Sequence, residues 1–178
     1  MAGSIIKITE TTVGSGVSTF DIGGSDWDSS YDVYQVVLSN IQLTDSTSAR
    51  INCRVLKSDN SADDTSNYDY TFTGFRTEAA FDDLPDTNQD KWQNFNYLFG
   101  GGSGFNSNGV LYLFNFNNAS EYNFLTVEMN SFGYDGDELM GTAGGAVHTV
   151  EQVSKGLQFS LTSSTYAGGK CVLYGLKK

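Results

Sequence analysis

The chain has 178 residues, the length of one domain, and a domain of this size holds together without disulfides or metal ions. Its formal net charge is −11 at pH 7, which opposes binding to nucleic-acid backbones or anionic membranes, so we expect neither as a partner. Glycine occurs 20 times, proline once, and aromatic residues make up 13% of the chain, a composition typical of all-β proteins with short strands and many turns.

The first twelve residues show only a short apolar set. Ile6 and Ile8 alternate with polar residues, and Ile5 adds a third apolar side chain. We predict that residues 1–12 are a docking arm outside the domain, which adds a strand to a partner's sheet edge through these isoleucines. The domain itself is expected to span residues 13–178.

Period-two alternation of apolar residues then predicts about nine strands. In chain order these lie at 17–22, 31–41, 51–55, 70–73, 110–116, 124–129, 145–152, 157–161 and 171–176. So many short strands fit two packed sheets better than one open sheet. A single jelly-roll-like β-sandwich of antiparallel strands is favoured. An immunoglobulin-like sandwich is the alternative, although its Cys–Trp–Cys spacing is absent.

Two long polar segments are predicted as loops, at residues 58–69 and 82–108. Residues 76–84 could make one turn of helix before Pro85. Long loops in compact domains are often functional. No segment has the composition of a linker that would divide the chain in two.

Aromatic residues in these polar segments have two interpretations. Trp27 lies in an acidic turn, and the second loop carries Trp92, Tyr97, Phe99 and Phe105. They pack into the core, or they stack on sugars or anchor a subunit interface.

Catalytic groups are scarce. The single histidine, His148, lies in an alternating stretch and is expected on a sheet face. No Gly-x-Ser-x-Gly turn accompanies it, and no phosphate-binding glycine loop is present. Cys53 and Cys171 occupy apolar positions, so we expect buried free thiols rather than a zinc site. We predict a protein that is not an enzyme and has no metal or cofactor.

Three segments carry a recognisable pattern: Tyr31–Ile41, Gly156–Leu161 and Gly169–Lys178. Together they read YDxYxhxhxNI, GhxF and GxhxLYGhK, where h is apolar. The pattern resembles that of small β-sandwich virion proteins of tailed bacteriophages, which decorate the head or sit in tail and head fibres. We also expect Leu157 and Leu173, from the last two segments, to pair across neighbouring core strands.

The resemblance implies a non-enzymatic structural protein of the virion. It would be a capsid decoration or cement protein, or a fibre-type subunit, made in the host cytoplasm without a signal peptide. Its partners would be itself, as a homotrimer, and the major capsid protein or another virion protein. The alternative is a carbohydrate-binding, host-recognition module, at a fibre tip or free-standing, which would hold a host-surface glycan through the loop aromatics.

Overall fold

The computed structural model describes residues 4–44, 49–77, 81–95, 106–132 and 139–177. Within them the chain is all-β, with eleven strands and one short 3-10 turn at Gly24–Asp26. The strands are β1 (Ser4–Thr12), β2 (Thr19–Gly23), β3 (Val33–Leu43), β4 (Ile51–Val55), β5 (Tyr68–Arg76), β6 (Asp82–Gln89), β7 (Ser107–Phe114), β8 (Asn123–Phe132), β9 (Leu139–His148), β10 (Gly156–Leu161) and β11 (Tyr166–Lys177).

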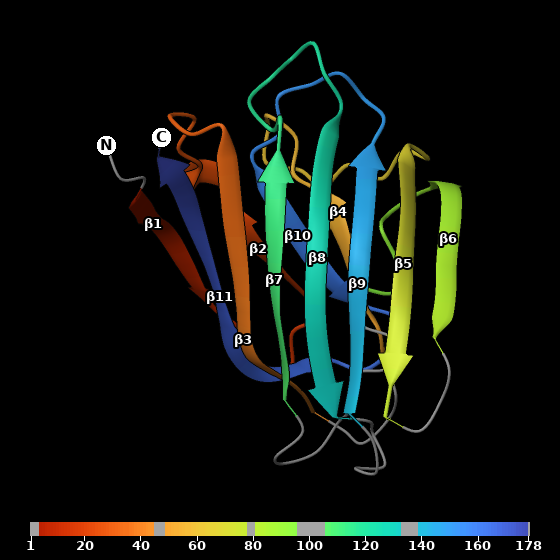
Figure 1. Cartoon of the computed structure of the whole chain (residues 1–178). Helices are drawn as coiled ribbons and strands as arrows, with labels where there is room; N and C mark the ends of the chain where they lie inside the picture. Colours follow the sequence, from red (N-terminus) through yellow and green to blue (C-terminus); the bar gives the residue numbers. More distant parts are fainter. Residues whose placement is uncertain (1–3, 45–48, 78–80, 96–105, 133–138, 178) are drawn as a thin grey trace.

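Two antiparallel sheets make up the sandwich (Figure 1). The large sheet has eight strands in the order β1-β11-β3-β7-β8-β9-β5-β6, and the small sheet has three in the order β2-β10-β4. The predicted antiparallel β-sandwich is therefore confirmed. The small sheet lies behind the large one in Figure 1, and among the described residues no element covers the opposite face of the large sheet.

Alternation along each strand builds one core between the sheets. Val36 and Leu38 of β3 point inward from the large sheet, and Leu157 and Phe159 of β10 point inward from the small one. Because alternate side chains of a strand lie on opposite faces, the residues between them face away from the core. The predicted core role of these segments is confirmed.

Trp92 connects the two sheets. Its backbone pairs with Cys53 of β4, and its indole nitrogen donates to the carbonyl oxygen of Val147 in β9 at 3.1 Å. The ring is fully buried and meets Tyr68 and Phe95 edge-on. A large side chain with a satisfied polar atom is a suitable bridge between two layers.

The first segment of the chain is an edge strand rather than a free arm, which corrects the predicted boundary after residue 12. β1 pairs antiparallel with β11 from Ser4 opposite Lys177 to Thr12 opposite Lys170, with a bulge between Lys7 and Thr9. The C-terminal strand offers it hydrogen-bonding groups that the local sequence does not reveal. Both ends of the chain therefore lie on the same side of the large sheet (Figure 1).

Residues 82–89 also differ from expectation. They form β6, which pairs with β5, where the sequence predicted a loop and, up to residue 84, part of a helical turn. Pro85 is compatible with this position because β6 is at the edge of the sheet, where a missing N–H is tolerated.

The strand predicted near 145–152 begins earlier and ends at His148, as β9. Its glycines interrupt the alternation of apolar residues, so the pattern does not predict the whole strand, but close strand packing requires them. A Cβ atom at Gly144 would lie 2.3 Å from the carbonyl oxygen of Thr71 on β5. Only a residue without a side chain fits there.

Leu157 and Leu173 are both fully buried, as expected, but they do not pair. Leu157 lies in β10 opposite Ile22 and Val55, whereas Leu173 lies in β11 of the other sheet. The shared sequence pattern thus contributes to both layers of the core.

Both cysteines are buried free thiols, as predicted. Burial raises the pKa of each thiol well above its usual value. Among the described residues, no helix has the length and apolar content that crossing a bilayer requires.

Candidate docking surfaces

One edge of the large sheet is open. β1 is the first strand of that sheet, so among the described residues only one of its two edges is paired. Ile5 and Ile6 on this strand are 56% and 41% exposed, whereas Ile8 packs partly against the core. An edge with exposed β-branched side chains is a template for another strand.

A small ionic cluster fixes the charges of this edge. Lys7 and Lys170 donate to the two carboxylate oxygens of Glu10 at 2.8 and 2.9 Å. The hydrogen bonds from Lys170 and then Lys7 lower the pKa of Glu10 to about 2. With two lysines on one carboxylate, this end of the sheet carries a local positive excess.

The opposite edge is protected against pairing. β6 carries Asp82, Asp83 and Asp86 together with Pro85. Charged residues and proline are the usual means of preventing a sheet edge from accepting another strand. The two edges of the large sheet therefore differ in both charge and readiness to pair.

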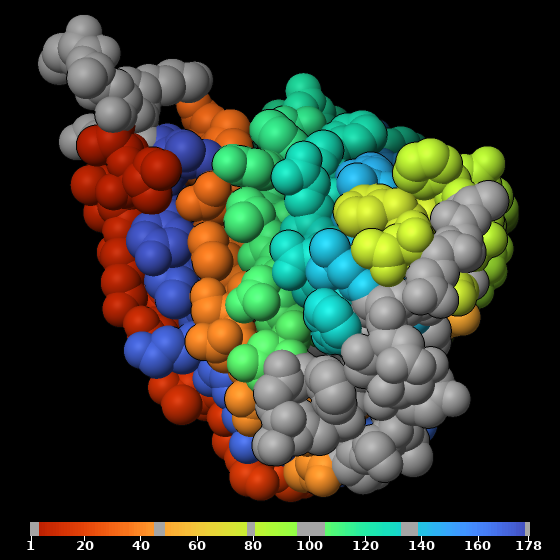
Figure 2. All heavy atoms as spheres, turned by 60° about the horizontal axis from the view of Figure 1, so that its bottom comes forward, coloured from red at the N-terminus to blue at the C-terminus, as the bar shows by residue number. Residues whose placement is uncertain are grey.

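The uncovered face of the large sheet, which we call the outer face, carries apolar side chains in register. One row crosses six strands, because the pairs Ile5–Leu176, Leu176–Val33, Val33–Phe114, Phe114–Phe124 and Phe124–Val147 are directly opposite. We call these six residues the apolar row. Phe124 is 44% exposed. Figure 2 shows the side chains of β11, β3, β7 and β8 in view across this face.

The next row on the outer face is amphipathic. Tyr174, Gln35, Tyr112 and Thr126 are opposite one another on β11, β3, β7 and β8. The Gln35 amide nitrogen donates to the Tyr112 hydroxyl at 2.9 Å, and Tyr112 is still 38% exposed. Beyond it, Val172, Val37 and Val110 are apolar, and the exposed side chain of Glu128 lies directly opposite Val110.

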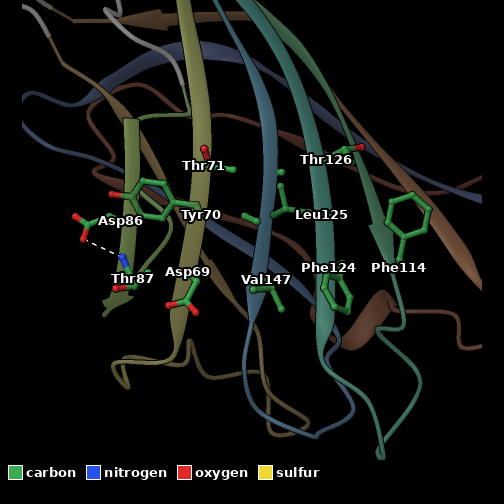
Figure 3. A pocket seen from close by; sticks show the side chains of 12 residues that line it. Asp69, Tyr70, Thr71, Asp86, Thr87, Phe114, Phe124, Leu125, Thr126 and Val147 are labelled. Carbon is green, nitrogen blue, oxygen red and sulfur yellow. Dashed lines mark hydrogen bonds between the residues drawn. The ribbon is translucent and has the colours of Figure 1, made fainter. Parts of the chain in front are cut away.

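A groove of about 500 Å³ lies on this face over β5, β8 and β9. Figure 3 shows Phe114 and Phe124 on one side of it and Asp86 and Thr87 on the other. Gly145 leaves the space between them open, since a Cβ there would meet only a carbonyl oxygen at 3.7 Å.

Backbone amides hold the two carboxylates of the groove. Asp69 accepts from the Asn88 amide at 2.7 Å, and Asp86 accepts from the Thr87 amide at 2.9 Å. Tyr70 lies beside Asp86, and burial, followed by the Asp86 charge, raises its pKa to about 12. The groove is thus preformed, with an aromatic side and an acidic side.

The loop aromatics predicted to bind do not form a site together. Trp92 is in the core, so its assignment as a glycan or interface residue is wrong. Trp27 is half-buried: its indole nitrogen donates to Asn117 at 2.8 Å, and its ring centroid lies 3.9 Å from that of Tyr34. Tyr97, Phe99 and Phe105 lie outside the described residues.

Phe114 and Phe124 were missed as site residues for a physical reason. Both lie within the strands that the sequence predicts at 110–116 and 124–129, and alternation alone does not tell which face of a strand is covered. The available signal was that residues 110–116 are apolar on both faces of one strand. Among the residues that the structure describes, only one face of the large sheet is covered by the small sheet, so Phe124 on the other face is exposed.

His148 is buried beside Asp63, whose side chain is 5% exposed. Its Nε2 lies 3.3 Å from Asp63 Oδ2, but among the described residues neither ring nitrogen has an aligned hydrogen-bond partner. Burial lowers the pKa of His148. Burial alone would raise the pKa of Asp63, but the Thr65 hydroxyl and amide, with further help from His148, lower it.

Comparisons with known proteins add no identification. No protein-family model and no curated protein matches the chain. One solved structure that it resembles is a fructofuranosidase variant from Schwanniomyces occidentalis in complex with fructosylnystose, at 8% identity and a TM-score of 0.25. The match covers 98% of this chain and 34% of that one. A TM-score this low supports no inference about the fold or the function of this chain.

Proposed function

We propose that the chain is a non-enzymatic structural subunit on the surface of a tailed-phage particle, of the capsid-decoration or fibre type. The observation that carries the proposal is the open edge of β1, with Ile5 and Ile6 exposed beside it. The virion-protein pattern supports it from the sequence, because its three segments fall on β3, β10 and β11.

Docking through β1 works by strand addition. A strand of the major capsid protein, or of another virion protein, pairs with the free backbone groups of β1, and its side chains contact the exposed isoleucines. The protected β6 edge makes the attachment one-sided, so that the subunit joins the particle in one orientation.

The experiment is to count copies of the chain in purified particles of the phage that encodes it, by quantitative mass spectrometry. The variant Ile5→Lys/Ile6→Lys places charges on the edge, which is expected to block strand addition. Val17→Lys is the matched control, since Val17 is also β-branched and 37% exposed but lies outside β1.

Copy number should be retained in Val17→Lys and fall at least tenfold in the double variant. Absence of the natural chain from the particle would refute the virion proposal. Retention of the double variant at full copy number would instead refute docking through β1.

Carbohydrate binding is the second candidate, and the groove between Phe124 and Asp69 favours it. Sugars present C–H faces to aromatic rings and hydroxyl donors to carboxylates. On a glycan array, Phe124→Ala and Asp69→Asn should then each abolish a signal given by the natural chain, whereas Tyr122→Ala should keep it. A natural chain that binds no glycan would exclude this candidate.

A further inference from the structure

We propose that two copies of this chain pack together through their outer faces, about a two-fold axis that runs parallel to the strands. β1 and β11 of one copy then lie over β6 and β5 of the other, and β7 lies over β8. This interface is separate from the β1 edge and from attachment to a particle, and it can be tested on the isolated chain.

The apolar content of the outer face requires a partner of similar breadth. The apolar row extends from Ile5 on β1 to Val147 on β9, and Val37 and Val110 lie two rows away. A patch this broad is unusual on a monomer and marks an interaction surface. The groove beside Phe124 occupies only one end of it, so a small ligand would leave most of the patch in water.

The size of the face fits a second sheet. Strands of eight to ten residues in an eight-stranded sheet give a face about 34 Å wide and about 30 Å long, or about 1,000 Å². Stable interfaces bury about 800 Å² on each partner. Two stacked outer faces therefore supply enough area even when their corners diverge through twist.

Charge selects the direction of the axis. Lys7 and Lys170 lie at the β1 end of the face, where Glu10 offsets only one of them. Asp69 and Asp83 lie at the β5–β6 end of this face, where Asp83 is opposite Thr73 and accepts a hydrogen bond from its hydroxyl. Rotation about an axis parallel to the strands brings the lysine end of each copy over the acidic end of the other. Rotation about an in-plane axis across the strands would place like charges together, which is unfavourable.

Side-chain size is complementary in the same arrangement. β3 comes to lie over β9 of the partner copy. On the outer face β3 carries Gln35 and Val37, whereas β9 carries Ala143 and Gly145. Larger side chains thus meet smaller ones, as facing sheets require for close packing.

In a ring of three copies the outer faces would not pack closely against one another. Three sheets about 34 Å wide would each stand about 10 Å from the axis, twice the roughly 5 Å between a sheet and the mid-plane of a sandwich. The apolar rows would then face an unfilled gap. A stacked pair closes that gap.

The test is sedimentation velocity of the full chain at roughly 1–100 µM, a range that detects a dimer whose Kd is micromolar or tighter. We expect a species of two 19.3 kDa protomers. Phe124→Asp should give a monomer, and Val17→Asp, which alters a similarly exposed residue away from the outer face, should remain dimeric. Far-UV circular dichroism confirms that each variant is folded.

Charge reversal tests the axis. Lys7→Glu and Asp83→Lys should each weaken the dimer about tenfold, because each reversal puts like charges together at two symmetric contacts. The combination Lys7→Glu/Asp83→Lys should restore the natural affinity, and 1 M salt should reduce these differences.

Three outcomes would overturn the proposal. One is a natural chain that stays monomeric at 100 µM. Another is a trimer or dimer that survives Phe124→Asp. The third is a charge-reversed double variant that associates as weakly as its single variants. That result would mean that the lysine end of one copy does not lie over the acidic end of the other.

Discussion

At the scale of single residues, His148 sets the pH dependence of stability near neutrality. It is the only histidine in the chain, and burial holds its pKa below the ordinary 6.5. Below that pH the unfolded chain binds a proton that the folded chain excludes, so acidification favours unfolding. We expect the urea midpoint to fall between pH 7.5 and 5.5. The lowered pKa of Asp63 acts in the same direction but at lower pH.

A variant without an imidazole isolates this effect. His148→Gln keeps a polar side chain but cannot titrate, so its urea midpoint should be nearly constant between pH 7.5 and 5.5, whatever its absolute stability. A variant slope equal to that of the natural chain would show that the pH dependence arises from other groups.

Burial determines how much a substitution lowers the unfolding free energy, as a comparison of Trp92 with Ile5 shows. Trp92→Ala removes a fully buried ring and its hydrogen bond to Val147, so we expect a loss of about 3–5 kcal/mol in unfolding free energy. Ile5→Ala, at an exposed position, should change it by less than about 0.5 kcal/mol. Equal effects of the two substitutions, measured by urea unfolding, would contradict the bridging role of Trp92.

At the scale of elements, β1 behaves as part of the sheet. Its register with β11 covers the whole strand, and Thr11 also donates to the carbonyl oxygen of Asp21 on β2 at 2.8 Å. Deleting residues 1–12 should therefore lower the melting temperature by several degrees and leave the edge of β11 exposed to aggregation. Deleting residues 1–3 is the control and should leave the melting temperature unchanged. An unchanged melting temperature in the longer deletion would restore the free-arm interpretation.

Elements were predictable where their own side chains alternate. β3, β4, β8 and β10 follow from that pattern, because one face of each is buried in the core. β1 and β6 did not follow, since their main contribution is backbone pairing at the two edges of the sheet. For the same reason the open edge and the outer face could not be located from the sequence. Both depend on which strands are neighbours, and that is set by pairing between distant segments.

At the scale of the whole molecule, the two sheets depend on one core. Phe159 of the small sheet stacks on Phe20 and is fully buried, in the same cluster as Val36 and Leu173 of the large sheet. Without the large sheet, the apolar face of the three-stranded sheet would be exposed to water, which is unfavourable. We therefore expect the sheets to unfold together rather than in sequence.

Two probes can test this cooperativity. Far-UV circular dichroism mainly follows the large sheet, whereas fluorescence includes Trp92, which joins β4 to β9. In urea the two transitions should coincide, and in Phe159→Ala they should shift together by an amount that reflects a loss of about 3–5 kcal/mol. A fluorescence change that precedes the dichroism change would instead mean that the small sheet detaches first. Phe159 belongs to the core cluster that both layers share, so coincidence in this variant is the stricter form of the test.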